Sequence, residues 1–196
     1  MPILQSFRRS KLEKQLLMKS NSSREIFQHL HHPSVVCTII SRKDLSQLSQ
    51  VMADTHRPDL LELRLDLLRD LIGEALDGIA QLATAPPVLI TARRGDEGGA
   101  GDLTSEARKN LILNHLDHAS FIDIEIRSLE AERWDTVIAK ARSQTPRIQI
   151  VGSFHDFQST PSSQELTGII NRGVQTGVDL VKIATRLHSP EDMSRL

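Results

Sequence analysis

The stretch LLELRLDLL at residues 60–68 places three charged side chains inside an apolar run. Glu62, Arg64 and Asp66 follow one another at a spacing of two residues, so on a β-strand all three would point to the same side of the sheet. Two interpretations of this row are open. The three side chains could form a self-neutralising ion network, or they could bind the hydroxyl groups of a substrate.

This stretch belongs to a repeating pattern. Apolar, β-branched runs start about every 25 to 33 residues, which is the length of one strand and one crossover helix. Between them, segments such as residues 42–56 and 105–119 have apolar residues at the three- and four-residue intervals typical of helices. The alternation predicts an α/β protein with a parallel sheet. The six expected strands are residues 35–40, 60–68, 87–94, 121–126, 147–154 and 179–185.

Ionisable side chains stand near the ends of five successive expected strands. They are Glu62, Arg64, Asp66, Arg93, Arg94, Asp123, Glu125, His155 and Lys182. A barrel brings the ends of its strands together around one site, whereas an open sheet spreads them along a line. We therefore predict a TIM (β/α)8 barrel.

The number of units is smaller than such a barrel needs. Residues 34–196 contain about six βα units, and a closed barrel has eight. We therefore expect an incomplete, C-terminally truncated barrel domain over these residues. The final residues, SPEDMSRL, predict a helix with Ser189 as its N-cap and Asp192 at the third helical position.

Residues 1–33 form a basic N-terminal extension in this interpretation, with six Lys or Arg residues and two acids. They lack the continuous apolar region of a secretory signal. Their basic, serine-containing composition is compatible with an organelle transit peptide, but we favour an extra helix or a loosely attached extension.

Composition narrows the class of protein. Apolar residues make up 39% of the chain and charged residues 25%, which is ordinary for a globular domain. No run of about 18 apolar residues exists, so we expect no membrane span. Aromatic residues are 3% and no basic stripe alternates with them, so we expect no nucleic-acid partner. The single cysteine, Cys37, excludes an internal disulfide, and we expect a reducing, cytoplasmic setting.

Lys182 and His155 are the strongest chemical signals. Lys182 stands in the apolar run DLVKIAT, and loss of solvation there would favour the neutral amine, which attacks carbonyl groups. His155 ends the preceding strand, and an imidazole can move a proton in both directions near neutral pH. Together they indicate Schiff-base chemistry. The structural alternatives are a lysine paired with Asp123 or Glu125 and a histidine that only holds a hydrogen bond.

The remaining acids and the glycine-rich loop also allow more than one interpretation. Asp66, Asp123 and Glu125 could ligate a divalent metal, but we predict no metal because Arg64 and Lys182 would compete for these carboxylates. The loop GDEGGAGD at residues 95–102 matches no phosphate-binding pattern. We interpret it as a loop over the site with Glu97 placed to orient a histidine, and a solvated turn is the alternative.

Five motifs in order resemble those of the type I 3-dehydroquinate dehydratases of the shikimate pathway. They are LELRLD, ITARRGDEGG, DIEI, SFHDFQSTP and DLVKIAT, and the resemblance runs from about residue 35 to 196. It implies a (β/α)8 barrel of the class I aldolase type, commonly a homodimer, that removes water from 3-dehydroquinate without a cofactor or metal. Some relatives are fused to a shikimate dehydrogenase.

The resemblance also implies roles for individual residues. Lys182 is the Schiff-base lysine, His155 the general acid and base, and Glu97 the acid that orients the histidine. Substrate-binding positions are Glu62 and Arg93, with Arg64 in the same motif and Thr38 as a weaker match. Two other hypotheses are a different class I aldolase that uses the same lysine, and a catalytically inactive barrel fragment that acts as an interaction domain.

Overall fold

The computed structural model describes residues 34–55 and 57–196. Six strands form one parallel sheet, and their order in the sheet is their order in the chain. They are β1 (Val36–Ile39), β2 (Leu60–Arg64), β3 (Val88–Thr91), β4 (Phe121–Glu125), β5 (Gln149–Asp156) and β6 (Leu180–Thr185). All six expected strands are therefore present. The expectations for residues 1–33 lie outside the described residues.

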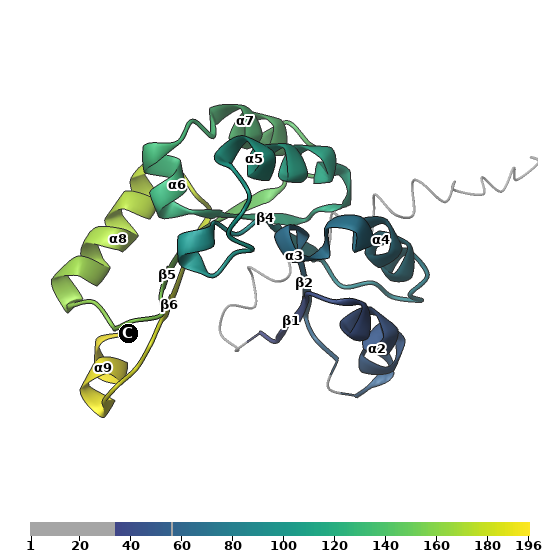
Figure 1. Ribbon diagram of the computed structural model, residues 1–196, viewed down its shortest axis with the longest axis horizontal. Helices are drawn as coiled ribbons and strands as arrows, with labels where there is room; N and C mark the ends of the chain where they lie inside the picture. The colour runs from purple at the N-terminus through teal and green to yellow at the C-terminus, as the bar shows by residue number, and fades with distance from the viewer. Residues whose placement is uncertain (1–33, 56) are drawn as a thin grey trace, which may run out of the picture.

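Helices alternate with these strands and cover one side of the sheet. They are α2 (Arg42–Ala53), α3 (Leu65–Leu68), α4 (Ile72–Ala80), α5 (Ser105–Asn114), α6 (Ile126–Ala131), α7 (Asp135–Arg142), α8 (Ser163–Gln175) and α9 (Pro190–Arg195). Short 3-10 turns lie at η1 (Arg69–Leu71), η2 (Gly95–Glu97) and η3 (Leu116–His118). Figure 1 shows the sheet curling, with the helices around its outer side, as half of a barrel would. The predicted α/β barrel architecture is confirmed in this half-barrel form.

Local sequence signals explain where several helices begin. The hydroxyl oxygens of Ser41 and Thr104 accept hydrogen bonds from backbone N–H groups in the first turns of α2 and α5. Ser162 and Ser189 begin α8 and α9 with complete capping boxes. The predicted helix start at Ser189, with Asp192 at the third position, is confirmed.

Two apolar layers lie on opposite sides of the sheet. The larger layer packs the outward side chains of β2 to β5, such as Leu63, Ile90 and Ile124, against the helices. The smaller layer consists of Leu89, Phe121 and Val151. Leu89 is paired in register with Glu62. The smaller layer is therefore on the inner side, below the charged strand ends.

The predicted strand at residues 60–68 is wrong beyond Arg64. The strand ends there, and Leu65–Leu68 form the helical turn α3. The carboxylate of Asp66 accepts hydrogen bonds from the backbone N–H groups of Arg93 (3.2 Å) and Ala100 (3.2 Å). Asp66 is therefore a buried anchor for the following loop, and it does not continue an alternating row with Glu62 and Arg64.

Candidate active site

Strand register brings the predicted catalytic side chains to one face. Ser153 of β5 is paired with Lys182 of β6, and Glu125 of β4 is paired with Ser153. Paired residues of adjacent parallel strands point to the same side, as do residues two apart on one strand. Lys182, Ser153 and His155 therefore share the inner face of the half-barrel.

Arg93 lies at the centre of this face. It follows β3, and its side chain is only 4% exposed. Its Nη1 donates to Asp123 Oδ1 (3.0 Å), to Glu125 Oε1 (3.3 Å) and to the hydroxyl of Ser153 (2.6 Å), and its Nη2 donates to Asp123 Oδ2 (3.1 Å). One guanidinium thus connects strands β3, β4 and β5.

The charges around Arg93 stabilise one another. Burial alone would disfavour the charged guanidinium, but Asp123 and Glu125 outweigh it and raise the pKa of Arg93 above its ordinary value. Burial likewise opposes ionisation of Asp123, yet Arg93 and Lys182 hold the pKa of this carboxyl below its ordinary value. Burial, reinforced by the charge of Asp123, raises the pKa of Glu125 against the influence of Arg93.

Lys182 reaches this cluster from the last strand. Its Nζ lies 3.6 Å from Oδ2 of Asp123, so the pairing with an acid that the sequence suggested is confirmed. The expectation of a desolvated lysine is wrong, because 40% of its side chain is exposed. In the described part of the chain β6 pairs with β5 alone, and all six of its residues are partly exposed.

His155 is held by Glu97. Oε2 of Glu97 accepts the backbone N–H of His155 (2.9 Å) and lies 3.0 Å from Nδ1 of its ring, and the Glu97 side chain is fully buried. The predicted contact between this loop acid and a histidine is confirmed. Glu97 belongs to η2, so residues 95–97 form a defined turn against β5 and the solvated-turn alternative is wrong.

The tautomer of His155 follows from its two neighbours. Nδ1 lies between Glu97 Oε2 and Nη1 of Arg93 (3.2 Å), and a single ring nitrogen cannot donate to one and accept from the other at once. A carboxylate can only accept, while Nη1 of Arg93 already has three other acceptors. We assign the proton to Nδ1, which leaves the lone pair of Nε2 free to take a proton.

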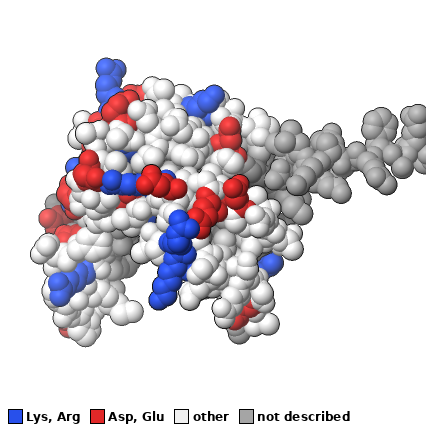
Figure 2. Space-filling model, turned by 45° about the vertical axis from the view of Figure 1, so that its right-hand side comes forward, with Lys and Arg blue, Asp and Glu red and all other residues white. Residues whose placement is uncertain are grey.

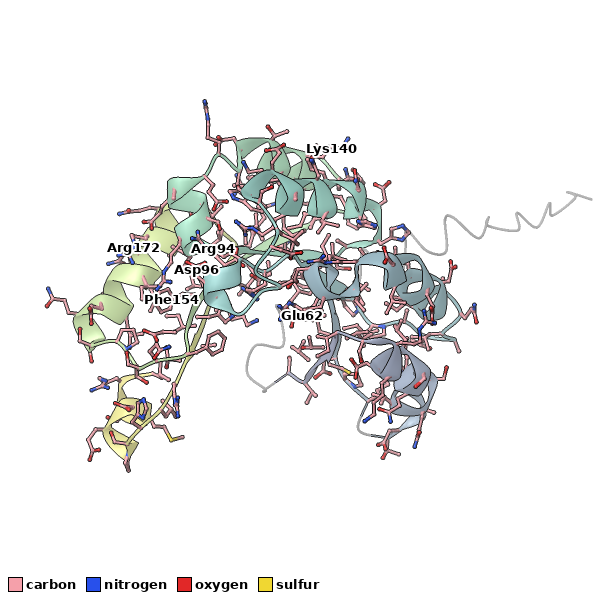
Figure 3. All side chains as sticks on the ribbon, viewed as in Figure 1. Glu62, Arg94, Asp96, Lys140, Phe154 and Arg172 are labelled. Carbon is pink, nitrogen blue, oxygen red and sulfur yellow. The ribbon has the colours of Figure 1, made fainter. Side chains whose placement is uncertain are left out.

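Glu62 lies on β2, at the end of the inner face opposite to Lys182 and His155. Thr38 donates to its Oε2 (2.9 Å) and Thr91 to its Oε1 (2.7 Å), and Nη2 of Arg93 lies 3.9 Å away. Glu62 is labelled in Figure 3. Thr38 and Glu62 are paired in register on β1 and β2, so the structure brings both predicted substrate-binding residues together with Arg93.

Arg64 has a different environment from Glu62. Its guanidinium pairs with both carboxylate oxygens of Asp66 (2.9 and 2.8 Å) and donates to the carbonyl of Gly98 (3.0 Å). This geometry supports the ion-network interpretation for Arg64 and Asp66. It ties the loop at residues 95–101 to the end of β2.

A second buried ion network lies behind the site. Arg108 of α5 is 2% exposed and donates to Glu125 Oε2 (2.9 Å) and to Glu132 Oε2 (2.8 Å), while its guanidinium stacks on Trp134 at 5.3 Å. Glu125 therefore bridges Arg93 on the inner side and Arg108 on the helix side. Sequence reasoning missed Arg108, since a basic residue in an amphipathic helix resembles a surface residue. It also missed Thr91 and Ser153, although their alternation with Arg93 and His155 could have indicated them.

The described part of the chain contains neither a group of side chains that could hold a metal ion nor a helix that could cross a membrane. Residues 34–55 and 57–196 contain no group of three or more His, Cys, Asp and Glu side chains arranged to hold a metal ion. None of the helices described is long and apolar enough to cross a bilayer. On the face that Figure 2 presents, acidic and basic side chains are interspersed.

The curled parallel sheet, with Lys182 and His155 on its inner face, defines a (β/α) barrel protein with a cluster of ionisable side chains on that face. The chain belongs to the type I 3-dehydroquinase family, whose model matches residues 36–196. The resemblance drawn from the five motifs is thereby confirmed.

Individual relatives agree with this assignment. A 3-dehydroquinate dehydratase of Methanococcus maripaludis (strain S2) is 30% identical over 165 residues, which are 83% of this chain and 72% of the relative. One of Methanocaldococcus jannaschii is 34% identical over 137 residues, 69% of this chain and 58% of the relative. The crystal structure of the 3-dehydroquinate dehydratase of Geobacillus kaustophilus superimposes with a TM-score of 0.72 at 26% identity, covering 84% of this chain and 66% of that one. The chain thus spans roughly three fifths to three quarters of these relatives.

Proposed function

We propose that this protein is a hydro-lyase that converts 3-dehydroquinate to 3-dehydroshikimate through an imine with Lys182, as a step of the shikimate pathway and of aromatic amino acid biosynthesis. Family membership supports the reaction, since relatives carry the name 3-dehydroquinate dehydratase. The observation that carries the proposal is the placement of Lys182 and the Glu97–His155 pair on one face, at adjacent strands.

The chemistry starts at the amine. Lys182 Nζ first releases to water the proton that it carries beside Asp123, and the free amine then attacks the C3 ketone of the substrate and gives a carbinolamine. Loss of water, with proton transfer by His155, gives an iminium that draws electrons from the neighbouring carbon. Asp123, 3.6 Å from Nζ, holds the lysine at this position and is the acid nearest to the cation that forms.

Proton transfer then falls to His155. Its Nε2 takes a proton from C2, and the electron pair of that C–H bond moves into the iminium to give an enamine. The electrons then return, the C1–O bond breaks, and the proton held on Nε2 leaves with the hydroxyl group as water. Glu97 stabilises the imidazolium that exists between the two transfers. Addition of water to the product iminium releases 3-dehydroshikimate and Lys182.

The hydroxyl groups of the substrate bind at the end of the inner face where Glu62 and Arg93 lie. Glu62, fixed by two threonines, and Arg93 present charged groups next to each other there. Thr38 supports Glu62 directly. Arg64 contributes to substrate binding as a positioning residue, because it holds at Gly98 the loop that carries Glu97.

Trapping of the imine tests the proposal. The full chain is incubated with 3-dehydroquinate and borohydride, and intact mass is measured. We expect a reduced adduct on Lys182 and none in Lys182→Ala. Lys140, whose side chain lies on α7 at the outer side, supplies the matched control, since Lys140→Ala should keep the adduct.

Other outcomes separate the remaining hypotheses. An adduct that forms with ketose phosphates in preference to 3-dehydroquinate would support a different class I aldolase. A folded chain without any adduct would contradict the proposal and support an inactive interaction domain. We further propose that residues 34–196 act as one catalytic domain, that the protein is a cytoplasmic homodimer, and that neither nucleic acid nor a metal takes part in its reaction. Sedimentation analysis tests the dimer.

A further inference from the structure

Arg127 lies in the first turn of α6 and has no place in the mechanism described above. Its Nε is 3.8 Å from Oε1 of Glu97, and its guanidinium lies over the ring of Phe154 at 4.7 Å from the centroid. Phe154 directly precedes His155 on β5 and belongs to an apolar cluster with Ile126 and Ile169. Arg127 therefore approaches the Glu97–His155 pair from the helix side of the sheet.

The two oxygens of Glu97 have different environments. Oε2 accepts twice from His155, through the backbone N–H and the ring nitrogen. Oε1 is buried, and among the described residues it accepts no hydrogen bond. A buried carboxylate oxygen without a partner is unfavourable unless a compensating charge is near. Arg127 supplies that charge at ion-pair distance.

The position of Arg127 is itself constrained. The cation–π contact with Phe154 orients the planar guanidinium. The acids Asp96 and Asp156 also interact electrostatically with Arg127. Figure 3 labels Phe154 and Asp96 near η2 and the end of β5. A side chain held in this way can fix the orientation of a neighbouring carboxylate.

We propose that Arg127 is a positioning residue that keeps Glu97 turned so that Oε2 faces Nδ1 of His155. Without Arg127, the carboxylate would rotate or leave its buried position to satisfy Oε1. The proton on Nδ1 would then lose its acceptor, and Nε2 would no longer be the only nitrogen with a free lone pair. The effect of Arg127 on turnover rests on the proposed function. The contacts that join Arg127, Glu97 and His155 exist in the free protein and can be tested without substrate.

Nuclear magnetic resonance of the full chain labelled with nitrogen-15 histidine tests that link without substrate. We expect a downfield, slowly exchanging Nδ1–H signal from His155, assigned by its loss in His155→Gln. Arg127→Gln should move this signal upfield, toward its position in Glu97→Gln. Arg127→Lys, which keeps the positive charge, should restore most of the shift. Arg172→Gln is the matched control, because Arg172 pairs with Glu130 on the exposed surface.

A double-mutant cycle on turnover tests the consequence for catalysis. Arg127→Gln should lower kcat about 10-fold at an unchanged KM, within the range of couplings in one hydrogen-bond network. In a Glu97→Gln background the same substitution should cause no further loss. Additive losses would show that Arg127 only packs on Phe154 and would overturn the proposal.

The possible failures are distinguishable. An Nδ1–H signal that is unchanged in Arg127→Gln overturns the positioning role, whatever the enzyme does. A wild-type chain that forms no borohydride adduct overturns the proposed function, while the resonance experiment still decides whether Arg127 acts on His155 through Glu97.

Discussion

Arg93 is the residue on which the inner face depends. It balances Asp123 and Glu125 and is 4% exposed, so its loss leaves buried carboxylates without a cation. We expect Arg93→Met to lower the free energy of unfolding by about 3–5 kcal/mol. Urea denaturation followed by circular dichroism measures this. Arg172→Met, which removes an exposed pair, should cost less than about 1 kcal/mol, and similar losses in both variants would contradict the prediction.

At the same scale, the sequence predicts the candidate reactive residues but not the buried network around them. Lys182, His155 and Glu97 are visible because ionisable groups are rare among apolar or glycine-rich neighbours. Ser153 and Arg108, which donate to Asp123 and Glu125, are not visible in this way, because a hydroxyl in a strand and an arginine in a helix are common. The contact between Arg93 and His155 joins residues 62 positions apart, and periodicity carries no information about such a pair.

The loop between β3 and α5 depends on close backbone approach at Gly99. A Cβ there would lie 2.1 Å from the carbonyl oxygen of Arg93, so Gly99→Ala must displace the loop that carries Glu97. We expect it to lower the free energy of unfolding by about 1–3 kcal/mol and to weaken the Nδ1–H signal of His155. Urea denaturation measures the change in stability, and the nitrogen-15 histidine spectrum measures the change in the Nδ1–H signal.

Gly73 in α4 provides the contrasting case. A Cβ at Gly73 would meet nothing within 4 Å, and the residue is exposed in a helix. Gly73→Ala should raise the free energy of unfolding by up to about 1 kcal/mol, because alanine favours the helix. A rise in the free energy of unfolding in Gly99→Ala, like that expected for Gly73→Ala, would contradict the steric argument at Gly99.

The sequence predicts which strands and helices form better than it predicts the residues at which they end. The six strands and the helix beginning after Ser189 follow from local patterns that each segment carries by itself. The end of β2 at Arg64 was missed, since Asp66 continues the alternation of charges in the sequence. What decides that boundary is the hydrogen bond from the backbone of Arg93 to Asp66, which is a contact across 27 residues.

For the whole molecule, Asp123 links stability to pH. Arg93 and Lys182 overcome the effect of burial and hold the pKa of Asp123 below its ordinary 3.8. A carboxyl with a lowered folded-state pKa stabilises the protein above its unfolded-state pKa, and this contribution is lost as the pH falls through the folded-state value. Glu125, whose pKa is raised chiefly by burial, acts in the opposite direction above its ordinary 4.5.

We therefore expect the urea midpoint to fall between about pH 5 and pH 2.5, and to fall less in Asp123→Asn than in the wild-type chain. The comparison of variants isolates Asp123 from the surface carboxylates, which titrate in both proteins. An equal fall in the two proteins would show that Asp123 carries no pH-linked stability.

Strand order has a consequence for how the chain folds. Every pairing in the sheet joins strands that are neighbours in the chain, as in the contact of Thr38 with Glu62 across 24 residues. Short closures of this kind cost little chain entropy, so the sheet can extend by one unit at a time as the ribosome releases it. The bond between Glu97 and His155 spans 58 residues and needs β5 in place first. A nascent chain in which β1 to β4 have already folded therefore still lacks the contact between Glu97 and His155.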